Sequence, residues 1–574
     1  MRNLELAAIL GEIADLLEIK GENPYKVRAY RRGAQAVALL ADDVRQLAAA
    51  GGLRRVDGIG EALEAKIREW AETGAIAYHQ RLLQEIPRGL IDVTRVPGVG
   101  PKLAKRMFEQ AGVESLDDLR RALRTGGLQG VAGLGPMAQA RIARALEEME
   151  VTAGRLPLAE ALAVATHWLE LLGASPGVAK VEVAGSLRRG KDHVGDVDIV
   201  VGAEAPQEVT AHVAALPGVK EVSTGAGAVS LRLPGGVRLD LCIVPLEAFA
   251  SALVCWTGSR GHVERLRERA EALGYRLGEA GLEETASGHR LLPGSEEELY
   301  RTLGLAYVPP EIREDRGEVE RAASGTLPRL VAAEDLRGDL HVHSTWSDGT
   351  ASIAEIARAA LEMGRAYVAI CDHSRSLRIA GGLGPEELRR QEEEILAVQE
   401  QFPGIRILRG IEVDILSDGR LDLPDEVLER LDIVVASVHS GLNQDRDRIT
   451  ERIVRAIEHP CVDVIGHPTG RRIGRRPPCE IDFDAVLAAA ARCGKALEIN
   501  ASPSRLDLPD ELAARAIEAG IALAIDTDAH DLDELRWFPY GLRVARRAGA
   551  EPRCILNTRS VEELLAWRRD RRGA

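Results

Sequence analysis

The 574 residues exceed one ordinary hydrophobic core, so we expect three or four domains. Hydrophobic residues make up 45% of the chain, yet no apolar run approaches the roughly 20 residues that cross a bilayer. The seven cysteines form no Cys-x-x-Cys pair, and the N-terminal residues lack the apolar centre of a signal peptide. We therefore expect a cytoplasmic protein without a disulfide scaffold, a cysteine zinc finger or a membrane anchor.

The net charge of −15 is unevenly distributed, because residues 1–150 are nearly balanced and the rest of the chain is acidic. This distribution fits local phosphate contacts in front of a carboxylate-rich metal region. Ordinary solvated surfaces explain it about equally well, so composition alone does not decide the function.

Two short glycine segments, at residues 56–60 (Val-Asp-Gly-Ile-Gly) and 96–100 (Val-Pro-Gly-Val-Gly), each precede a helical pattern. Such turns at a helix N-terminus leave N–H groups free to bind a DNA phosphate, which positions DNA without reading its sequence. A weaker third copy spans residues 130–135. One copy alone would as readily be a plain turn, but two favour helix-hairpin-helix DNA binding. The expected DNA-binding residues are Gly58, Gly60, Gly98, Gly100 and Lys102.

Residues 25–32 (Tyr-Lys-Val-Arg-Ala-Tyr-Arg-Arg) place cations and two tyrosines on an expected helix, which suits either a DNA end or a solvated surface. This N-terminal part resembles the lyase domain of DNA polymerase β. The resemblance places Lys66 where that family keeps its Schiff-base lysine, although Glu64 and Glu69 give its amine no obvious help.

An α/β pattern begins near residue 155. A strand at residues 181–184 leads into Gly185-Ser186-Leu187-Arg188-Arg189, and the next strand carries Asp196 and Asp198 on one face. A further strand offers Asp240. Three neighbouring carboxylates repel one another unless cations compensate, and two Mg²⁺ or Mn²⁺ ions would do so. The Gly-Ser turn followed by Asp-x-Asp is the nucleotidyltransferase signature, so we expect Asp196, Asp198 and Asp240 to be catalytic metal ligands.

Downstream segments carry a more specific resemblance. Trp256-Thr257-Gly258-Ser259, residues 299–305 and residues 308–314 resemble the closing segments of the family X DNA polymerases. The resemblance implies that Arg238 orients the carboxylates. It also implies that the incoming nucleotide is bound by Gly185, Ser186, Arg189, Trp256, Gly258 and Ser259.

Three positions depart from the family pattern. Cys255 replaces a frequent tyrosine, Val263 replaces a nucleotide-contacting asparagine, and residues 225–228 (Gly-Ala-Gly-Ala) lack the Thr-Lys that contacts the primer phosphate. We therefore expect weaker nucleotide and primer binding, with the chemistry retained.

From residue 337 onward, short apolar segments alternate with helical patterns, and most of these segments end in a potential metal ligand. This alternation predicts a β/α barrel whose chemistry gathers at the C-terminal ends of the strands. The expected ligands are His341, His343, Asp348, His373, Glu412, His439, His467, Asp528 and His530. Imidazoles and carboxylates together suit two or three Zn²⁺, Mn²⁺ or Fe²⁺ ions.

The whole series resembles the polymerase-and-histidinol-phosphatase (PHP) domain, which implies metal-dependent attack of water on a phosphoester. Arg375 and Arg471 follow two of the expected ligands. They would either hold a substrate phosphate or, as is more common, be surface arginines.

The sequence thus predicts a multidomain fold: helical helix-hairpin-helix domains, an α/β nucleotidyltransferase palm, an α+β thumb and a C-terminal distorted (β/α)7 barrel. The expected boundaries are 1–85, 86–150, 151–255, 256–317, a linker at 318–336, and 337–574.

The resemblance implies a monomeric gap-filling DNA repair polymerase that uses dNTPs and gapped or primer-template DNA, joined to a 3′–5′ exonuclease or phosphoesterase with an activity at abasic sites. Two alternatives remain open: a repair nuclease with a weakened or inactive polymerase module, and a metal-dependent phosphatase with accessory DNA-binding domains.

Overall fold

The computed structural model describes residues 2–38, 44–56, 58–152, 154–216, 221–225, 228–233 and 237–572. Two parts of the sequence analysis lie outside these ranges: Asp57 of the first glycine segment, and residues 226–227 of the segment that lacks the family's Thr-Lys. The chain divides into two compact units, one with residues 1–153 and one with almost all of residues 154–574. No helix in the described ranges combines the length and apolar character needed to cross a membrane.

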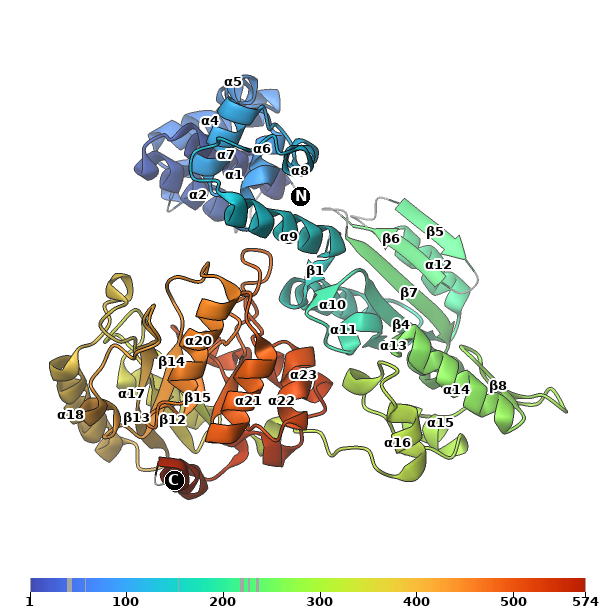
Figure 1. Cartoon of the computed structure of the whole chain (residues 1–574). Helices are drawn as coiled ribbons and strands as arrows, with labels where there is room; N and C mark the ends of the chain where they lie inside the picture. The colour runs from blue at the N-terminus through green and yellow to red at the C-terminus, as the bar shows by residue number, and fades with distance from the viewer. Residues whose placement is uncertain are drawn as a thin grey trace. The chain divides into compact units, whose positions relative to one another are not determined.

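The first unit is helical (blue in Figure 1). Its helices surround one apolar core that contains Trp70, Leu90 and Met107. Gly58 and Gly98 take positive φ angles of 90° and 89°, which glycine adopts without strain. The helices are α1 (Arg2–Lys20), α2 (Pro24–Ala38), α3 (Val44–Ala49), α4 (Glu61–Thr73), α5 (Ala77–Glu85), α6 (Gly89–Thr94), α7 (Pro101–Ala111), α8 (Leu116–Thr125) and α9 (Pro136–Thr152).

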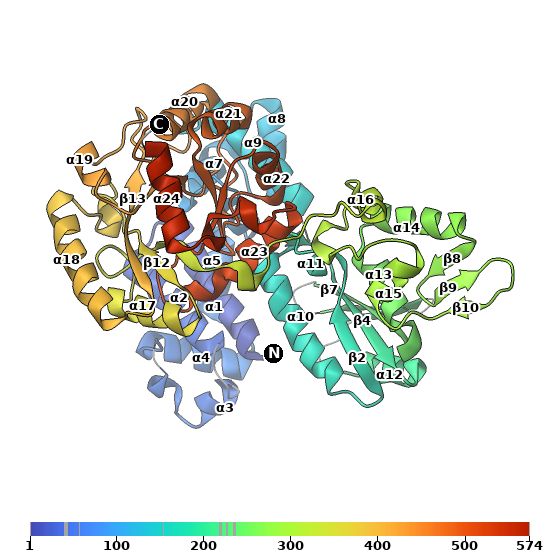
Figure 2. The same cartoon turned by 90° about the horizontal axis from the view of Figure 1, so that it is seen from below.

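The palm is a five-stranded sheet in the order β2-β4-β7-β6-β5. Its strands are β2 (Val178–Val183), β4 (Val197–Ala203), β5 (Glu221–Gly225), β6 (Ala228–Arg232) and β7 (Arg238–Pro245). Helices α10 (Leu158–Gly173) and α12 (Pro206–Ala214) pack on one face of the sheet, as Figure 2 shows. Helix α13 (Phe249–Thr257) packs on the other face. The apolar residues of β4 are therefore buried on both faces of the sheet. The polar residues at the strand ends are the candidates for a catalytic site.

The thumb packs around a smaller core of its own. It contains α14 (Arg260–Ala272), the antiparallel strands β8 (Tyr275–Gly278), β9 (Gly281–Glu284) and β10 (Arg290–Leu291), α15 (Glu296–Thr302) and α16 (Glu318–Ser324). His262 is fully buried, with its Nδ1 2.6 Å from Glu318 Oε1 and its Nε2 2.8 Å from the Tyr300 hydroxyl. Glu318, the residue at which the expected linker begins, is thus fixed to the thumb. The domain boundaries inside this unit stay predictions.

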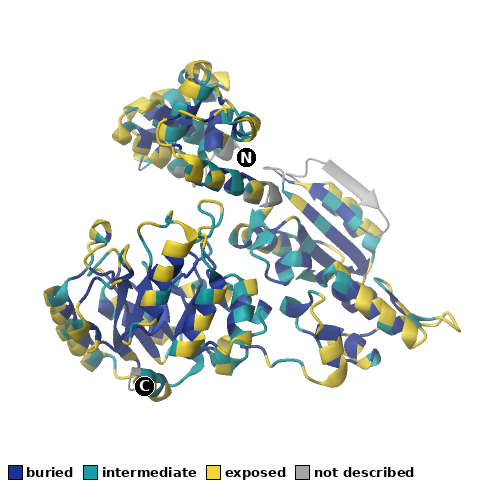
Figure 3. Cartoon of the chain, viewed as in Figure 1, coloured by how far each residue is buried: buried dark blue, intermediate teal, exposed yellow. Residues whose placement is uncertain are grey.

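The C-terminal part is a nearly closed barrel of seven parallel strands in chain order, β11 to β17. Their runs of β-branched and aliphatic residues are buried throughout (dark blue in Figure 3), as expected for parallel strands covered by helices. The strands are β11 (Gly338–Val342), β12 (Tyr367–Ile370), β13 (Arg406–Asp414), β14 (Ile433–Ser437), β15 (Val464–Ile465), β16 (Ala496–Asn500) and β17 (Leu523–Asp526). A parallel bridge between Val342 and Ala529 joins β11 to the segment after β17.

Helices connect successive strands of the barrel, and caps define where they begin. Ser352 accepts the N–H of Glu355 at the start of α17, and Asp482 accepts the N–H of Ala485 at the start of α21. The long helices are α17 (Ile353–Glu362), α18 (Pro385–Gln401), α20 (Arg446–Ile457), α21 (Phe483–Cys493), α22 (Asp510–Glu518), α23 (Phe538–Arg547) and α24 (Val561–Arg572). The predicted (β/α)7 barrel is confirmed.

A buried carboxylate joins the palm to the thumb. Glu296, at the start of α15, receives hydrogen bonds of 2.7 and 2.9 Å from Arg188 and of 2.7 Å from Arg313. Burial alone would raise the pKa of Glu296, but Arg313 and Arg188 outweigh it and lower the pKa to about 2. The Gly-Ser turn of the palm is thereby held against the thumb.

Glu296→Gln should lower the free energy of unfolding at pH 7 by about 3 kcal/mol, because the buried guanidinium of Arg313 and the half-buried one of Arg188 lose their anion. The folded pKa lies below the unfolded value near 4.5, so this stabilisation is present above pH 4.5 and is lost as the pH falls towards 2. The free energies of unfolding of the wild type and the variant, measured with denaturant, should therefore become equal as the pH falls. The exposed neighbour Glu297→Gln is the control, and equal stability of the two variants at pH 7 would contradict this account.

Candidate metal centres and nucleic-acid contacts

The palm site begins at the turn that follows β2. Gly185, the first residue of α11 (Gly185–Arg188), has a φ of 59°, and an added Cβ would lie 1.7 Å from Asp198 Oδ2. Only glycine therefore lets the turn approach this carboxylate. The backbone conformation at Gly185 thus places the predicted phosphate-binding turn in close contact with Asp198, a predicted metal ligand.

The structure brings Asp196, Asp198 and Asp240 together. Strands β4 and β7 run parallel with Asp198 opposite Asp240, and Asp196 immediately precedes β4. One oxygen of each carboxylate lies within 4.8 Å of the others. Burial, followed by repulsion from Asp196 and Asp240, raises the pKa of Asp198 to about 8.

Few cationic groups balance these charges. Arg238 pairs with Asp196 and, through Nε at 3.0 Å, with Asp240. The hydroxyl of Ser230, which the sequence did not indicate, donates to Asp240 Oδ1 at 2.6 Å. A guanidinium that pairs with two of the three carboxylates leaves negative charge uncompensated, so the donor set fits Mg²⁺ or Mn²⁺.

Arg189, a predicted triphosphate contact, is held by protein groups. Its buried guanidinium pairs with Glu314 at 2.9 Å and donates to the Thr257 carbonyl at 2.8 Å. Arg547 of α23 pairs with the same Glu314 at 2.9 Å and donates to the Arg189 carbonyl. Arg189 therefore anchors the turn to the thumb and the barrel, and its contact with nucleotide stays a prediction.

The other predicted nucleotide contacts lie at the junction of α13 and α14. Trp256 donates to Glu279 at 2.9 Å, and Ser259 caps α14 by accepting the N–H of His262. Gly258 lies against the His262 ring, where an added Cβ would come within 2.9 Å. Ser186 belongs to α11. The nucleotide-binding roles of these residues stay predictions.

Two of the atypical positions are described. Val263 is buried, and burial raises the pKa of the half-buried Cys255 thiol to about 12. Both side chains therefore act as packing groups here.

All three glycine segments form the same turn. An N–H donates to the carbonyl three residues earlier in each, from Ile59, Val99 and Leu134, at 3.1, 2.8 and 3.1 Å. Gly60 and Gly100 cap α4 and α7, and Lys102 is exposed in the first turn of α7. The weaker third segment has the same geometry before α9, with Gly133 at a φ of 85°. Phosphate binding by these turns stays a prediction.

Lys66 lies beside an aromatic ring surrounded by cations. Its Nζ is 5.4 Å from the centre of the Tyr78 ring, and Lys26 donates to the Tyr78 hydroxyl at 2.9 Å. Glu64 pairs with Arg54 and Arg68. Arg81 of α5 lies 5.6 Å from the centre of the same ring. Lys26 and Arg81 are distant from Lys66 in the sequence, so the local sequence around Lys66 could not indicate them. Tyr30 is buried, so of the two tyrosines in α2 only Tyr25 is available to stack on DNA.

The barrel ligands converge around Glu412 at the C-terminal ends of the strands. Glu412 is fully buried and lies 2.7 Å from His373, 3.0 Å from His467, 3.2 Å from His439 and 3.6 Å from His341. Burial opposes its ionisation, but the histidines outweigh this and hold the pKa of Glu412 well below its usual range.

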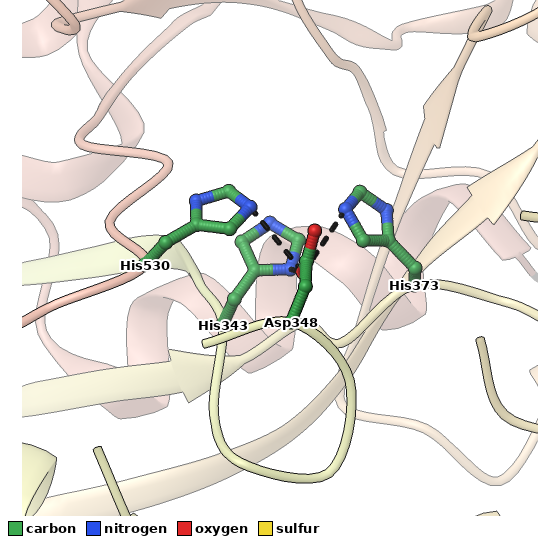
Figure 4. A group of neighbouring side chains, drawn as sticks. All are labelled: His343, Asp348, His373 and His530. Carbon is green, nitrogen blue, oxygen red and sulfur yellow. Dashed lines mark ion pairs between the residues drawn. The ribbon is translucent and has the colours of Figure 1, made fainter. Parts of the chain in front are cut away.

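Asp348 forms a second focus (Figure 4). It approaches His530 at 3.4 Å, His373 at 3.5 Å and His343 at 3.9 Å. His343 also lies 3.0 Å from Asp528 through its other ring nitrogen. All nine predicted ligands thus meet at one rim of the barrel.

Carboxylates and amides that the sequence analysis missed orient these ligands. Asp414 lies 3.0 Å from His439 Nδ1, Glu498 lies 2.7 Å from His341 Nδ1, and Asn500 donates to Asp528 at 3.0 Å. Strand alternation was the available signal, because Asp414 is two residues from the predicted ligand Glu412 and shares its face. Such outer partners fix the orientation of metal-binding histidines.

The barrel residues fit a metal centre. Burial, followed by repulsion from His373 and His530, lowers the pKa of His343 to about 3, so its ring is neutral as a ligand must be. Within the described residues, His343 Nδ1 is buried without a hydrogen-bond partner. A cavity of about 490 Å³ opens on Asp348, His373, His439, His467 and His530.

The two predicted phosphate arginines are engaged elsewhere. Arg375 donates to the Asp422 carbonyl at 2.8 Å. Arg471 pairs with Asp192 of the palm at 2.9 Å and donates to the carbonyls of Arg505 and Leu506. Arg505 instead lines the cavity, with Nε 3.5 Å from Asp528.

Gly185→Ala should reduce primer extension at least about 100-fold, because the new methyl group displaces Asp198 by an ångström or more. Gly195→Ala is the matched control, since open space surrounds that glycine. Primer extension by both variants, with circular dichroism to verify folding, tests this geometry. Normal extension by Gly185→Ala would contradict it.

Protein-family models match four parts of the chain. They describe a helix-hairpin-helix domain at residues 1–76, a SAM-like helix-hairpin-helix tandem at 90–148, a DNA polymerase beta thumb at 252–314 and a PHP domain at 339–502. The tandem covers the second and third glycine turns.

Among similar proteins, the DNA polymerase/3'-5' exonuclease PolX of Bacillus subtilis (strain 168) is 38% identical over 570 residues, which is 99% of each chain. A probable phosphatase of Thermoanaerobacter sp. (strain X514) is 35% identical over 232 residues, 38% of this chain and 89% of the relative. A probable phosphatase of Caldanaerobacter subterraneus is 32% identical over 245 residues, 41% of this chain and 91% of the relative. The full-length match, the thumb and the PHP barrel together show that this chain belongs to the family X DNA polymerases that carry a PHP domain.

Proposed function

We propose that the chain fills short gaps during DNA repair in its palm and removes nucleotides from DNA 3′ ends in its barrel. The observation that carries this proposal is the presence of two clusters of metal-ligand type in one chain, Asp196-Asp198-Asp240 and the barrel residues around Glu412 and Asp348, which His467 joins through Glu412. The Bacillus subtilis relative, matched along its whole length, is a DNA polymerase and 3′–5′ exonuclease. Cleavage at abasic sites is a further activity proposed for the barrel.

In the palm, Asp196, Asp198 and Asp240 would hold two Mg²⁺ or Mn²⁺ ions. When bound, such ions align the primer 3′-hydroxyl with the triphosphate and stabilise the developing charge. Arg238 restrains two of the carboxylates. The Gly185 turn offers backbone N–H groups to the triphosphate, close to the carboxylates.

In the barrel, the nine residues would hold two or three Zn²⁺, Mn²⁺ or Fe²⁺ ions. When bound, such ions activate water and polarise a phosphoester. Asp414 and Glu498 restrain the rings of His439 and His341, and Glu412 offers its buried carboxylate to neighbouring ligand sets. The cavity admits the phosphoester beside Arg505.

The proposed partners are gapped or primer-template DNA and dNTPs, with the chain acting as a monomer. The helix-hairpin-helix turns and the thumb support DNA binding. Within the described residues no cysteine takes part in a disulfide, which suits the reducing cytoplasm.

A nuclease with a weakened polymerase is the second candidate. The buried Val263 and the engaged Arg189 favour it, whereas the intact palm carboxylates favour the bifunctional enzyme. The probable phosphatases match 38% and 41% of this chain, and their names do not account for its DNA-binding and polymerase parts.

Asp198→Asn should abolish extension of a primer at a one-nucleotide gap and leave 3′ shortening intact, and Glu412→Gln should do the reverse. Each loss should reach about 100-fold or more, because a metal ligand is removed. Gel assays with Mn²⁺, with and without dNTPs, measure both activities, and the exposed Glu204→Gln is the control. A wild type that shortens DNA and never extends it would establish the nuclease alternative instead.

Lys66 is proposed to form a Schiff base with a 5′-deoxyribose phosphate end. Borohydride should trap this adduct in the wild type and in Lys105→Ala, and Lys66→Ala should remove it. Denaturing gels with labelled DNA give the measurement. Absence of an adduct, or an adduct that survives Lys66→Ala, would rule out this role.

A further inference from the structure

The cavity beside the barrel cluster is lined by chemically different residues. Candidate metal ligands, among them Asp348 and His373, line it together with Arg505. Leu377, Ile379 and Trp537 also line it and add an apolar part. Its volume of about 490 Å³ lies in the range of ordinary small-ligand sites, about 300–1,000 Å³.

Arg505 provides a fixed cation for a phosphate. The residue is 7% exposed, and its Nη1 has no hydrogen-bond partner within the described part of the chain. Its loop is anchored, because Arg471 holds the carbonyls of Arg505 and Leu506 at 2.8 and 2.5 Å. A planar guanidinium with an open donor suits phosphate oxygens.

Ile379 is exposed to solvent on a short loop whose ends are held by hydrogen bonds. It is 96% exposed, more than any other large hydrophobic side chain in the described ranges, of which Tyr25 comes next at 76%. The loop is closed by the Leu383 N–H, which donates to the His373 carbonyl at 2.7 Å, and Ser376 N–H donates to Asp422 at 2.7 Å. An isolated exposed apolar residue is ordinary, but this one lines the metal cavity together with a tryptophan.

We propose that Ile379 and Trp537 form a nucleobase subsite for the terminal nucleotide at a DNA 3′ end, with Arg505 binding the scissile phosphate. This inference rests on the proposed exonuclease function and assigns its substrate contacts. The terminal base leaves its partner, packs on Trp537 and is separated from the next base by Ile379. Base-aromatic stacking tolerates every base, as removal of successive nucleotides requires.

The subsite predicts different effects for the two residues. Ile379→Ala should slow removal of a paired 3′ nucleotide about tenfold and leave a mispaired nucleotide within about threefold, because only the paired end needs separation. Trp537→Ala should slow removal of both about tenfold, and Trp537→Phe should retain most of the activity. Leu396→Ala, an exposed apolar residue on α18 outside the cavity, is the matched control.

Fluorescence of a 3′-terminal 2-aminopurine, measured with the full chain in EDTA, reports base separation without cleavage. The signal should rise on binding to the wild type and to Leu396→Ala, and should rise much less with Ile379→Ala.

Equal 2-aminopurine signals and equal rates for Ile379→Ala, Trp537→Ala and the wild type would overturn the subsite while leaving exonuclease activity established. If the substitutions changed only the sedimentation of the protein, and neither the fluorescence nor the rates, Ile379 and Trp537 would form a protein contact. That result would also overturn the subsite. A wild type that shortens no DNA at all would instead refute the proposed barrel function.

Discussion

The barrel depends on one buried carboxylate. Glu412 is excluded from water, and an ionised group is costly in such a place unless partners compensate it. Four imidazoles, carried by or following β11, β12, β14 and β15, approach it within 2.7–3.6 Å. The ends of separate strands therefore converge on Glu412. The other candidate ligands, the cavity and Arg505 lie around the same residue.

In the palm, by contrast, the carboxylates are only partly compensated by positive charge. Arg238 pairs with two of the three carboxylates, and burial together with repulsion from Asp196 and Asp240 raises the pKa of Asp198. The turn that approaches this site is also tied to the rest of its unit: Arg189 and Arg547 share Glu314, and Arg471 pairs with Asp192. Ion pairs therefore fix the palm turn to the barrel, and the two candidate centres stand on one connected scaffold.

Much of this arrangement could be predicted from the sequence, because strand alternation places Asp196 and Asp198 together and parallel strands bring their terminal histidines to one rim. Contacts between distant segments could not be predicted in this way. Arg189 and Arg471 have the residue type of phosphate ligands, yet tertiary ion pairs occupy them. The contacts of Glu498 with His341 and of Arg505 with Asp528 follow only from the fold, and so does the packing of Tyr30 against Tyr78.

Two separate metal centres in one chain can be located by anomalous X-ray scattering from crystals grown with Mn²⁺ and a gapped DNA. We expect peaks between Asp196, Asp198 and Asp240 and further peaks around Glu412 and Asp348. Asp198→Asn should weaken only the first set, and Glu412→Gln only the second. Ordered side chains without a peak at either cluster would contradict a metal centre at that cluster.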